Sequence, residues 1–356
     1  MVPSRDAILA SLANVIDPEL RKPVTELDMV RELVIDGGAV TVTIALTVAG
    51  CPLRNSFQEQ VAREVGAVEG VESVKLEFDV MTPDERAALT DRLRGGRPAD
   101  DKSIQVAPTT RVIAVASGKG GVGKSSLTAN LAAAFAAQGH RVGILDADIY
   151  GHSIPHMLGI SQKPVLVDQL MIPPVKHDLK LMSIGFFLEG NKPLMWRGPM
   201  LHRALEQFLQ DVHWGDLDLL VVDMPPGTGD VSISLGQLLP RAEAVVVTTP
   251  QLLAQEVASR AAQMARETGM QLLGVIENMT SEVFGSGGGE RLATQLGVDL
   301  LGSVPLDARM REAGDVGTPL VVSDPDCETS EAIAEIAHAI VGARRAGFTS
   351  TLPLVF

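Results

Sequence analysis

Cysteines, aromatic residues and long apolar runs are all scarce in this chain of 356 residues. The two cysteines, Cys51 and Cys327, lie far apart, so a disulfide framework and a Cys-x-x-Cys metal site are both excluded. Aromatic residues make up only 3% of the sequence, which suits an α/β protein with an Ala-, Val- and Leu-rich core better than a β-sandwich. No apolar run approaches the ~20 residues that a membrane-spanning helix needs.

Basic residues are scarce as well, because 30 Lys and Arg stand against 44 Asp and Glu and leave a net charge of −14. Residues 1–100 carry 11 basic and 17 acidic side chains, so this part is not a basic module either. The balance argues against bulk binding to nucleic acid or to an anionic membrane, and we expect neither as a partner. Met1 to Leu20 lacks the apolar core of a signal peptide, so the sequence predicts a reducing, cytoplasmic location.

The periodicity of apolar residues divides the chain into two predicted domains. Residues 1–95 combine helical patterns with short alternating strands, which is typical of a small α+β domain. Residues 96–110 are rich in Gly, Pro and charge and are predicted to be a linker. Residues 111–343 alternate short apolar runs with helical stretches, which predicts an α/β domain whose mostly parallel sheet is covered by helices on both faces. Residues 344–356 are predicted to be a loose tail.

The most specific motif is a phosphate-binding loop. The sequence Gly-Lys-Gly-Gly-Val-Gly-Lys-Ser at residues 118–125 matches the pattern G-x-x-x-x-G-K-[ST] between a predicted strand and a predicted helix. Backbone N–H groups and the helix N-terminus would close around phosphate oxygens. We expect Lys124 to reach the β- and γ-phosphates of ATP and Ser125 to bind Mg²⁺. The predicted nucleotide-binding residues of this loop are Gly118, Lys119, Gly120, Gly121, Val122, Gly123, Lys124, Ser125 and Ser126.

The loop contains a second lysine, Lys119, which cannot easily reach the phosphates of its own subunit. It could reach a nucleotide held by a second protomer, as an arginine finger does in trans. We therefore predict a homodimer in which Lys119 and Lys124 are both catalytic. The pattern K-G-G-x-G-K-S resembles the deviant Walker A signature of the MinD, ParA and nitrogenase-iron-protein class, whose members sandwich ATP between two subunits.

Carboxylates at predicted strand ends supply the remaining candidates. Asp223 ends an apolar strand in the Walker B manner and is expected to hold the Mg²⁺ shell. Asp148 is assigned to orienting the attacking water and Asp146 to the neighbourhood of the metal, although their order is open and helix capping is the alternative. Asn278 could read adenine through its amide, and Asp307 is a weaker candidate for the same pocket. For both of these, a capping or turn role is an equal alternative.

The combination of motifs resembles the Mrp/ApbC branch of that class, P-loop ATPases that carry iron–sulfur clusters to apoproteins. The motifs that carry this resemblance are Asp146–Ser153, Met195–Met200, Asp223–Asp230, Thr248–Gln251, Glu277–Met279 and Phe284–Glu290. The N-terminal domain resembles the small iron–sulfur-assembly domain that is often fused ahead of this branch, through Asp17–Glu19 and Thr47–Pro52. The resemblance implies a homodimeric ATP hydrolase that uses ATP and Mg²⁺ and works with the assembly machinery and apo iron–sulfur proteins.

One departure from the family pattern concerns the cluster ligands. The family's usual Cys-x-x-Cys pair would fall in Thr280–Val283, which contains no cysteine. Cys51 follows a strand at a Gly-Cys-Pro turn, where a thiolate is favoured, so it is a candidate cluster thiol, and a small buried hydrophobe is the equal alternative. Two rival functions therefore stay open, a positioning ATPase of the MinD/ParA kind and a cluster-free assembly scaffold.

Overall fold

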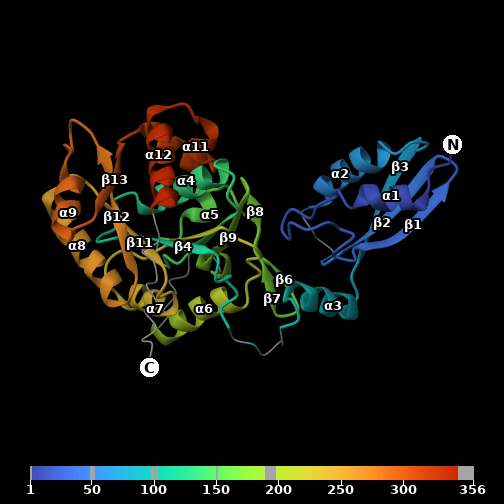
Figure 1. Ribbon diagram of the computed structural model, residues 1–356, viewed down its shortest axis with the longest axis horizontal. Coiled ribbons are helices and arrows are strands. Elements are labelled where there is room, and N and C mark those ends of the chain that lie inside the picture. The colour runs from blue at the N-terminus through green and yellow to red at the C-terminus, as the bar shows by residue number, and fades with distance from the viewer. Residues whose placement is uncertain are drawn as a thin grey trace, which may run out of the picture.

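The computed structural model of the chain describes residues 2–48, 53–97, 101, 103–149, 151–188 and 198–343. A small N-terminal α+β region lies beside a larger α/β body (Figure 1). Cys51 and the predicted tail, residues 344–356, fall outside the described residues.

The N-terminal region is a three-stranded sheet with helices packed on it. Strands β1 and β2 form an antiparallel hairpin, and β3 pairs with β2 in parallel because α2 crosses between them. The elements are α1 (Arg5–Leu12), β1 (Val30–Asp36), β2 (Ala39–Leu46), α2 (Arg54–Gly66), β3 (Ser73–Val80) and α3 (Pro83–Leu93). The Thr82 hydroxyl accepts a hydrogen bond from the Glu85 amide, and the Glu85 carboxylate accepts one from the Thr82 amide, so a capping box begins α3 at Pro83.

The large body is built on an eight-stranded sheet in the order β13-β12-β11-β4-β10-β5-β9-β8, in which only β8 is antiparallel. Helices lie above and below this sheet in Figure 1, as the continuous apolar runs of its strands predict. Its strands are β4 (Arg111–Ser117), β5 (Val142–Asp146), β8 (Val175–Lys176), β9 (Leu179–Ser183), β10 (Leu219–Asp223), β11 (Glu243–Thr248), β12 (Gln271–Thr280) and β13 (Asp299–Pro305).

The helices up to α9 lie between successive strands, and the last three helices follow β13. They are α4 (Lys124–Ala137), α5 (Ile154–Met157), a short 3₁₀ turn (Ile184–Phe187), α6 (Gly198–Gln210), α7 (Asp230–Leu238), α8 (Leu252–Glu267), α9 (Gly288–Leu296), α10 (Ala308–Val316), α11 (Leu320–Ser323) and α12 (Glu328–Gly342). Helices α4 and α12 pack against each other, and α8 packs against β4 and β11. Among the described helices, none is both long and apolar enough to cross a membrane.

A hairpin of the large body completes the core of the N-terminal region. Strands β6 (Val165–Val167) and β7 (Leu170–Ile172) pair antiparallel and lie beside α3 in Figure 1. Val167, Leu170 and Ile172 belong to the same buried cluster as the N-terminal core. This hairpin, which the apolar pattern did not predict, therefore ties the two regions together.

The hairpin offers a matched pair of substitutions. Leu170 is 2% exposed and Leu166 is 60% exposed. We expect Leu170→Ala to lower the free energy of unfolding by about 3 kcal/mol, because it leaves a cavity where the two regions meet. Leu166→Ala should change it by less than about 0.5 kcal/mol. Urea denaturation of both variants tests this, and equal effects would contradict the shared core.

Candidate nucleotide-binding site

The loop after β4 is held in a conformation that only glycine adopts easily. Gly121 and Gly123 have φ angles of +81° and +80°. A Cβ on Gly118 would lie 2.1 Å from the backbone carbon of Val257 in α8, so the loop and this helix make close backbone contact. Gly123 caps α4, and the first backbone N–H groups of that helix therefore face the loop.

The predicted lysine, serine and aspartate meet at the first turn of α4. Lys124 is 6% exposed, and its Nζ lies 2.8 Å from Oδ1 of Asp223. Ser125 donates its hydroxyl hydrogen bond to the other oxygen of Asp223 at 2.6 Å. Thr128, which the motif does not mark, also donates to Asp223 at 2.8 Å, one helical turn further on.

The second strand end adds two more carboxylates. Asp146 pairs in register with Asp223 across β5 and β10, and both side chains are fully buried. Burial and the neighbouring Asp223 carboxylate raise the pKa of Asp146 to about 8, although Ser183 donates a hydrogen bond to it. Asp148 lies just beyond the strand, with Oδ2 3.5 Å from the Lys124 Nζ and Oδ1 accepting from the Gly151 amide.

This donor set fits a divalent cation. The hydroxyl of Ser125 and the carboxylates of Asp146 and Asp223 supply hard oxygen atoms, which Mg²⁺ prefers. The Lys124 ammonium is the only cationic group that contacts Asp223 among the described residues. If a phosphate drew Lys124 away, the buried carboxylates would need another positive charge.

Lys119 differs from the buried Lys124 in its exposure and in its side-chain contacts. Its side chain is exposed and makes no hydrogen bond or ion pair with any of the described residues. Its backbone oxygen accepts a hydrogen bond from the Ser117 hydroxyl, which fixes the loop below it. Of the two loop lysines, Lys124 therefore contacts Asp223 and Lys119 does not.

A cavity of about 230 Å³ lies beside the loop and contains both predicted adenine contacts. Asn278 lines it, but the Asn278 amide donates to the Val122 backbone oxygen at 2.8 Å. Asp307 caps α10 and pairs with Arg309, whose guanidinium holds the pKa of Asp307 at about 2. The sequence analysis missed the apolar lining, which comes from Met157, Met279, Pro305, Leu306 and Met310.

Glu277 is a further residue that the sequence analysis left without a role. It is 2% exposed, and its carboxylate accepts hydrogen bonds from the backbone amides of Gly287, Gly288 and Gly289. The first turn of α9 is thereby fastened to the end of β12. A glutamate at the end of an apolar strand, 10 residues before Gly287 of a glycine-rich run, is the signal that could have indicated it.

The segment Thr280–Val283, where the cysteine pair is missing, forms a turn closed by paired backbone hydrogen bonds between Ser281 and Gly285. Val283 is 84% exposed at its tip. Cys327 is buried next to α10 and α11, and its thiol contacts the Ser330 hydroxyl, so it is not open to a ligand. The predicted cluster thiol, Cys51, lies outside the described residues.

The Asp17-Pro18-Glu19 motif lies where the N-terminal region meets the large body. Asp17 caps its own turn by accepting from the amides of Glu19 and Leu20. Burial raises the pKa of Glu19 to about 8, and burial lowers the pKa of the nearby Lys180 to about 8. Lys180 donates to the backbone oxygens of His213 and Trp214, so β9 and the segment after α6 face this motif together.

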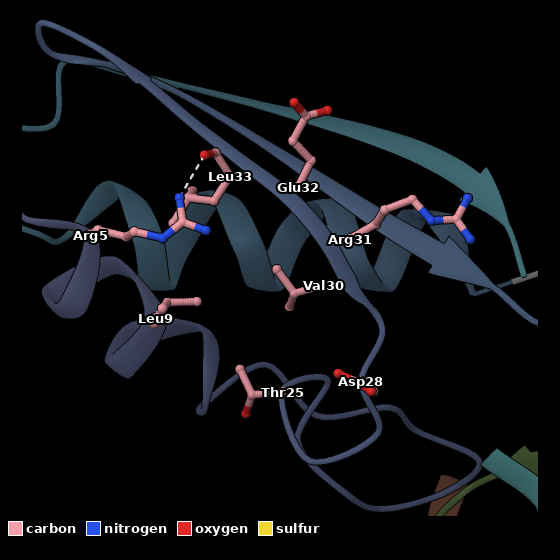
Figure 2. A pocket seen from close by; sticks show the side chains of 8 residues that line it. All are labelled: Arg5, Leu9, Thr25, Asp28, Val30, Arg31, Glu32 and Leu33. Atoms are coloured by element: carbon pink, nitrogen blue, oxygen red, sulfur yellow. Dashed lines mark hydrogen bonds between the residues drawn. The ribbon is translucent and has the colours of Figure 1, made fainter. Parts of the chain in front are cut away.

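A separate cleft of about 170 Å³ lies within the N-terminal region (Figure 2). Arg5 donates to the Leu33 backbone oxygen there, and Arg31 is paired with Asp79 and Glu85. Both arginines are therefore bound to groups of the N-terminal region itself, and no residue of the phosphate-binding loop lines this cleft.

Comparison with known families gives two matches. A profile described as NUBPL iron-transfer P-loop NTPase matches residues 108–341. A profile described as iron-sulfur cluster assembly protein matches residues 5–76.

Curated relatives match along nearly the whole chain. An iron-sulfur cluster carrier protein of Mycobacterium tuberculosis is 50% identical over 356 residues, covering 95% of this chain and 93% of the relative. Proteins of the same name from Synechocystis and Bacillus subtilis are 42% and 39% identical, covering 95% and 85% of this chain and 97% and 88% of their own lengths.

Solved structures match the large body. A nucleotide-binding protein of Archaeoglobus fulgidus in complex with ADP is 38% identical with a TM-score of 0.52, covering 58% of this chain and 86% of its own. The cell division ATPase MinD of Pyrococcus furiosus has a TM-score of 0.54 at 22% identity, covering 65% of this chain and 98% of its own, and shows the same fold.

The buried His213 predicts a pH effect on stability. Burial and the charge of Lys180 lower the pKa of His213 to about 3, so the folded chain keeps this imidazole neutral where the unfolded chain, with a pKa near ~6.5, is protonated. The free energy of unfolding should therefore fall as the pH drops from about 6.5 to about 3, by up to ~1.4 kcal/mol per pH unit from this group. His213→Gln should remove that part of the slope.

Urea denaturation at several pH values measures the slope. His338→Gln, a change at an exposed position of α12, is the matched control and should leave the slope of the parent chain intact. Equal slopes for the parent chain and His213→Gln would contradict the assignment.

Proposed function

The chain belongs to the family of NUBPL iron-transfer P-loop NTPases, and we propose that it is an ATP-driven iron–sulfur cluster carrier that delivers clusters to apoproteins. The observation that carries the nucleotide part is the meeting of Lys124, Ser125 and Asp223 at the N-terminus of α4. The relatives named iron-sulfur cluster carrier protein, together with the N-terminal assembly-protein match, support the cargo.

ATP hydrolysis would use groups already positioned around the loop. The backbone amides of residues 118–125 would bind phosphate oxygens, and Lys124 would leave Asp223 to neutralise charge on the β- and γ-phosphates. Ser125, Asp223 and Asp146 would hold Mg²⁺, which supplies Lewis-acid stabilisation of the phosphate charge when bound. Asp148, released from Lys124 by the same movement, would orient the attacking water.

The segment Met224–Gly229 is suited to report the nucleotide state. The amide of Gly227 donates to the Ser117 backbone oxygen at 2.8 Å, directly before the phosphate-binding loop. The Ser232 hydroxyl of α7 donates to the backbone oxygens of Pro225 and Gly227. A change at the γ-phosphate would therefore reach α7 through a short chain of contacts.

We infer a homodimer with a shared nucleotide site. Lys119 is exposed beside the loop and lacks a side-chain partner among the described residues. Leu252 and Leu253 are 68% and 73% exposed at the start of α8, the helix that contacts Gly118. An apolar edge next to an unpaired lysine fits a second copy that accepts Lys119 at its own phosphates.

The cargo would depend on Cys51. A cluster needs thiolate or other soft ligands, and the second cysteine, Cys327, is buried against Ser330. A cluster shared by Cys51 of two subunits, with outside ligands completing it, would be labile and easily handed to an apoprotein. Such exchange suits a reducing cytoplasm.

Mixing two inactive variants tests the nucleotide site and the dimer together. Lys119→Ala and Lys124→Ala should each keep less than about 1% of the ATPase activity. In a mixed dimer one site would hold Lys124 in cis and Lys119 from the partner. Random pairing of equal amounts should therefore restore about a quarter of the parent activity.

Steady-state phosphate release measures this recovery, with Lys163→Ala, an exposed lysine outside the loop, as the control that keeps full activity. No recovery on mixing would mean that Lys119 acts within its own subunit or not at all. Full activity of Lys124→Ala would refute the nucleotide site itself.

Anaerobic reconstitution with iron and sulfide tests the cargo. The parent chain and Cys327→Ala should take up iron, develop visible absorption and transfer the cluster to an apo-acceptor. Cys51→Ala should lose both iron uptake and cluster transfer. Uptake by Cys51→Ala would refute the thiol assignment. Absence of uptake by the parent chain would remove the carrier function and leave the ATPase measurement unaffected.

A further inference from the structure

An apolar groove of about 670 Å³ lies at the end of the large sheet opposite the phosphate-binding loop. We call it the basal groove, since the first residues of β4 and β11 are among those that line it. Its apolar lining comes from two segments on either side, the chain before β4 and the end of α7, namely Ile104, Val106, Leu238, Leu239 and Ala242. Ile104, Val106 and Leu238 are only partly buried there.

The described chain ends at the rim of this groove. Arg111 lines the basal groove, and its guanidinium donates to the backbone oxygens of Val341 and Ala343 at 3.1 and 3.5 Å. Arg111 also pairs with Glu243 of β11, which fixes its side chain in place. The end of α12 therefore lies at the rim of the groove.

The composition of residues 344–356, the tail segment, matches the groove. After Arg345 the tail segment has no Lys, Arg, Asp or Glu, and its apolar side chains are Phe348, Leu352, Leu354, Val355 and Phe356. An extended chain covers at most ~3.5 Å per residue, so a segment of this length reaches across a cavity of this size. Burial of such side chains is favourable in proportion to the apolar area removed from water.

The tail segment is favoured as the occupant of the groove because it is covalently attached next to it. A segment joined to the rim is present at an effective concentration of the order of mM, whereas a second copy or another protein must also lose translational and rotational freedom. The groove carries the Arg111–Glu243 pair at its rim and no unpaired acidic group that would select a basic partner.

We propose that the tail segment binds in the basal groove of its own chain. There it covers Ile104 and Val106, which belong to the connection between the N-terminal region and the large body. Gln105, between them, already donates its amide to the Leu209 backbone oxygen.

Photo-crosslinking in the full chain tests the proposal. With p-benzoylphenylalanine in place of Phe348, ultraviolet light should join the tail segment to residues 103–112 or 238–243, identified by mass spectrometry. Equal mixing of ¹⁴N- and ¹⁵N-labelled chains distinguishes the sources, because a link within one chain pairs only light with light and heavy with heavy. The same photoreactive residue in place of Phe284, which lies on the distant turn, is the control and should give no such link.

A groove variant shows that the contact is specific. Ile104→Glu should lower the yield of the crosslink at least about tenfold, because it places a charge in the apolar contact. Val34→Glu, a matched change at an exposed position of β1, should leave the yield unchanged.

Three results would overturn the proposal. Mixed light–heavy links to the groove would mean that the tail segment binds a second copy. Links to other segments, or none above the Phe284 control, would mean that the basal groove is not its binding site. An unchanged yield in Ile104→Glu would mean that the contact does not depend on the groove.

Discussion

The structure depends on how three carboxylates are kept together at one edge of a buried sheet. Asp146 and Asp223 end neighbouring strands with no exposure to solvent, and Asp148 follows two residues later. Buried carboxylates repel each other and lose hydration, so they persist only when a proton or cation balances them. Here Lys124 supplies that charge from the first turn of α4. The requirement for balance makes nucleotide and metal binding interdependent, because a phosphate that draws Lys124 away leaves Asp223 in need of another cation.

A few hydrogen bonds link the carboxylates at this sheet edge to the N-terminal region and to α7. Ser183, at the end of β9, donates to Asp146, while Lys180 of the same short strand lies beside the N-terminal acidic motif. The Gly227 amide donates to the backbone oxygen of Ser117, the last residue of β4. The nucleotide site thus shares a strand with the contact to the N-terminal region and a backbone hydrogen bond with the segment leading into α7.

The sequence predicted the sheet, the loop and the meeting of Lys124, Ser125 and Asp223, because strand periodicity and the spacing of the motif are local signals. The β6–β7 hairpin escaped prediction, since strands of three residues give no period and their burial depends on the distant α3. Glu277 and Thr128 were missed for a similar reason, because each acts on groups that only the folded chain brings near. Asn278 was predicted as an adenine contact or a turn residue. It lines the cavity beside the loop, and its amide also donates to the Val122 backbone oxygen, a contact that a side-chain inventory does not reveal.

The account is tested most directly by a crystal structure of the chain with Mg²⁺ and a non-hydrolysable ATP analogue. It predicts the triphosphate in the loop of residues 118–125, with the Lys124 Nζ within about 3 Å of a phosphate oxygen and no longer on Asp223. It also predicts the metal beside Ser125 and Asp223. A nucleotide bound elsewhere, or Lys124 still paired with Asp223 beneath a bound triphosphate, would contradict the charge balance on which the account rests.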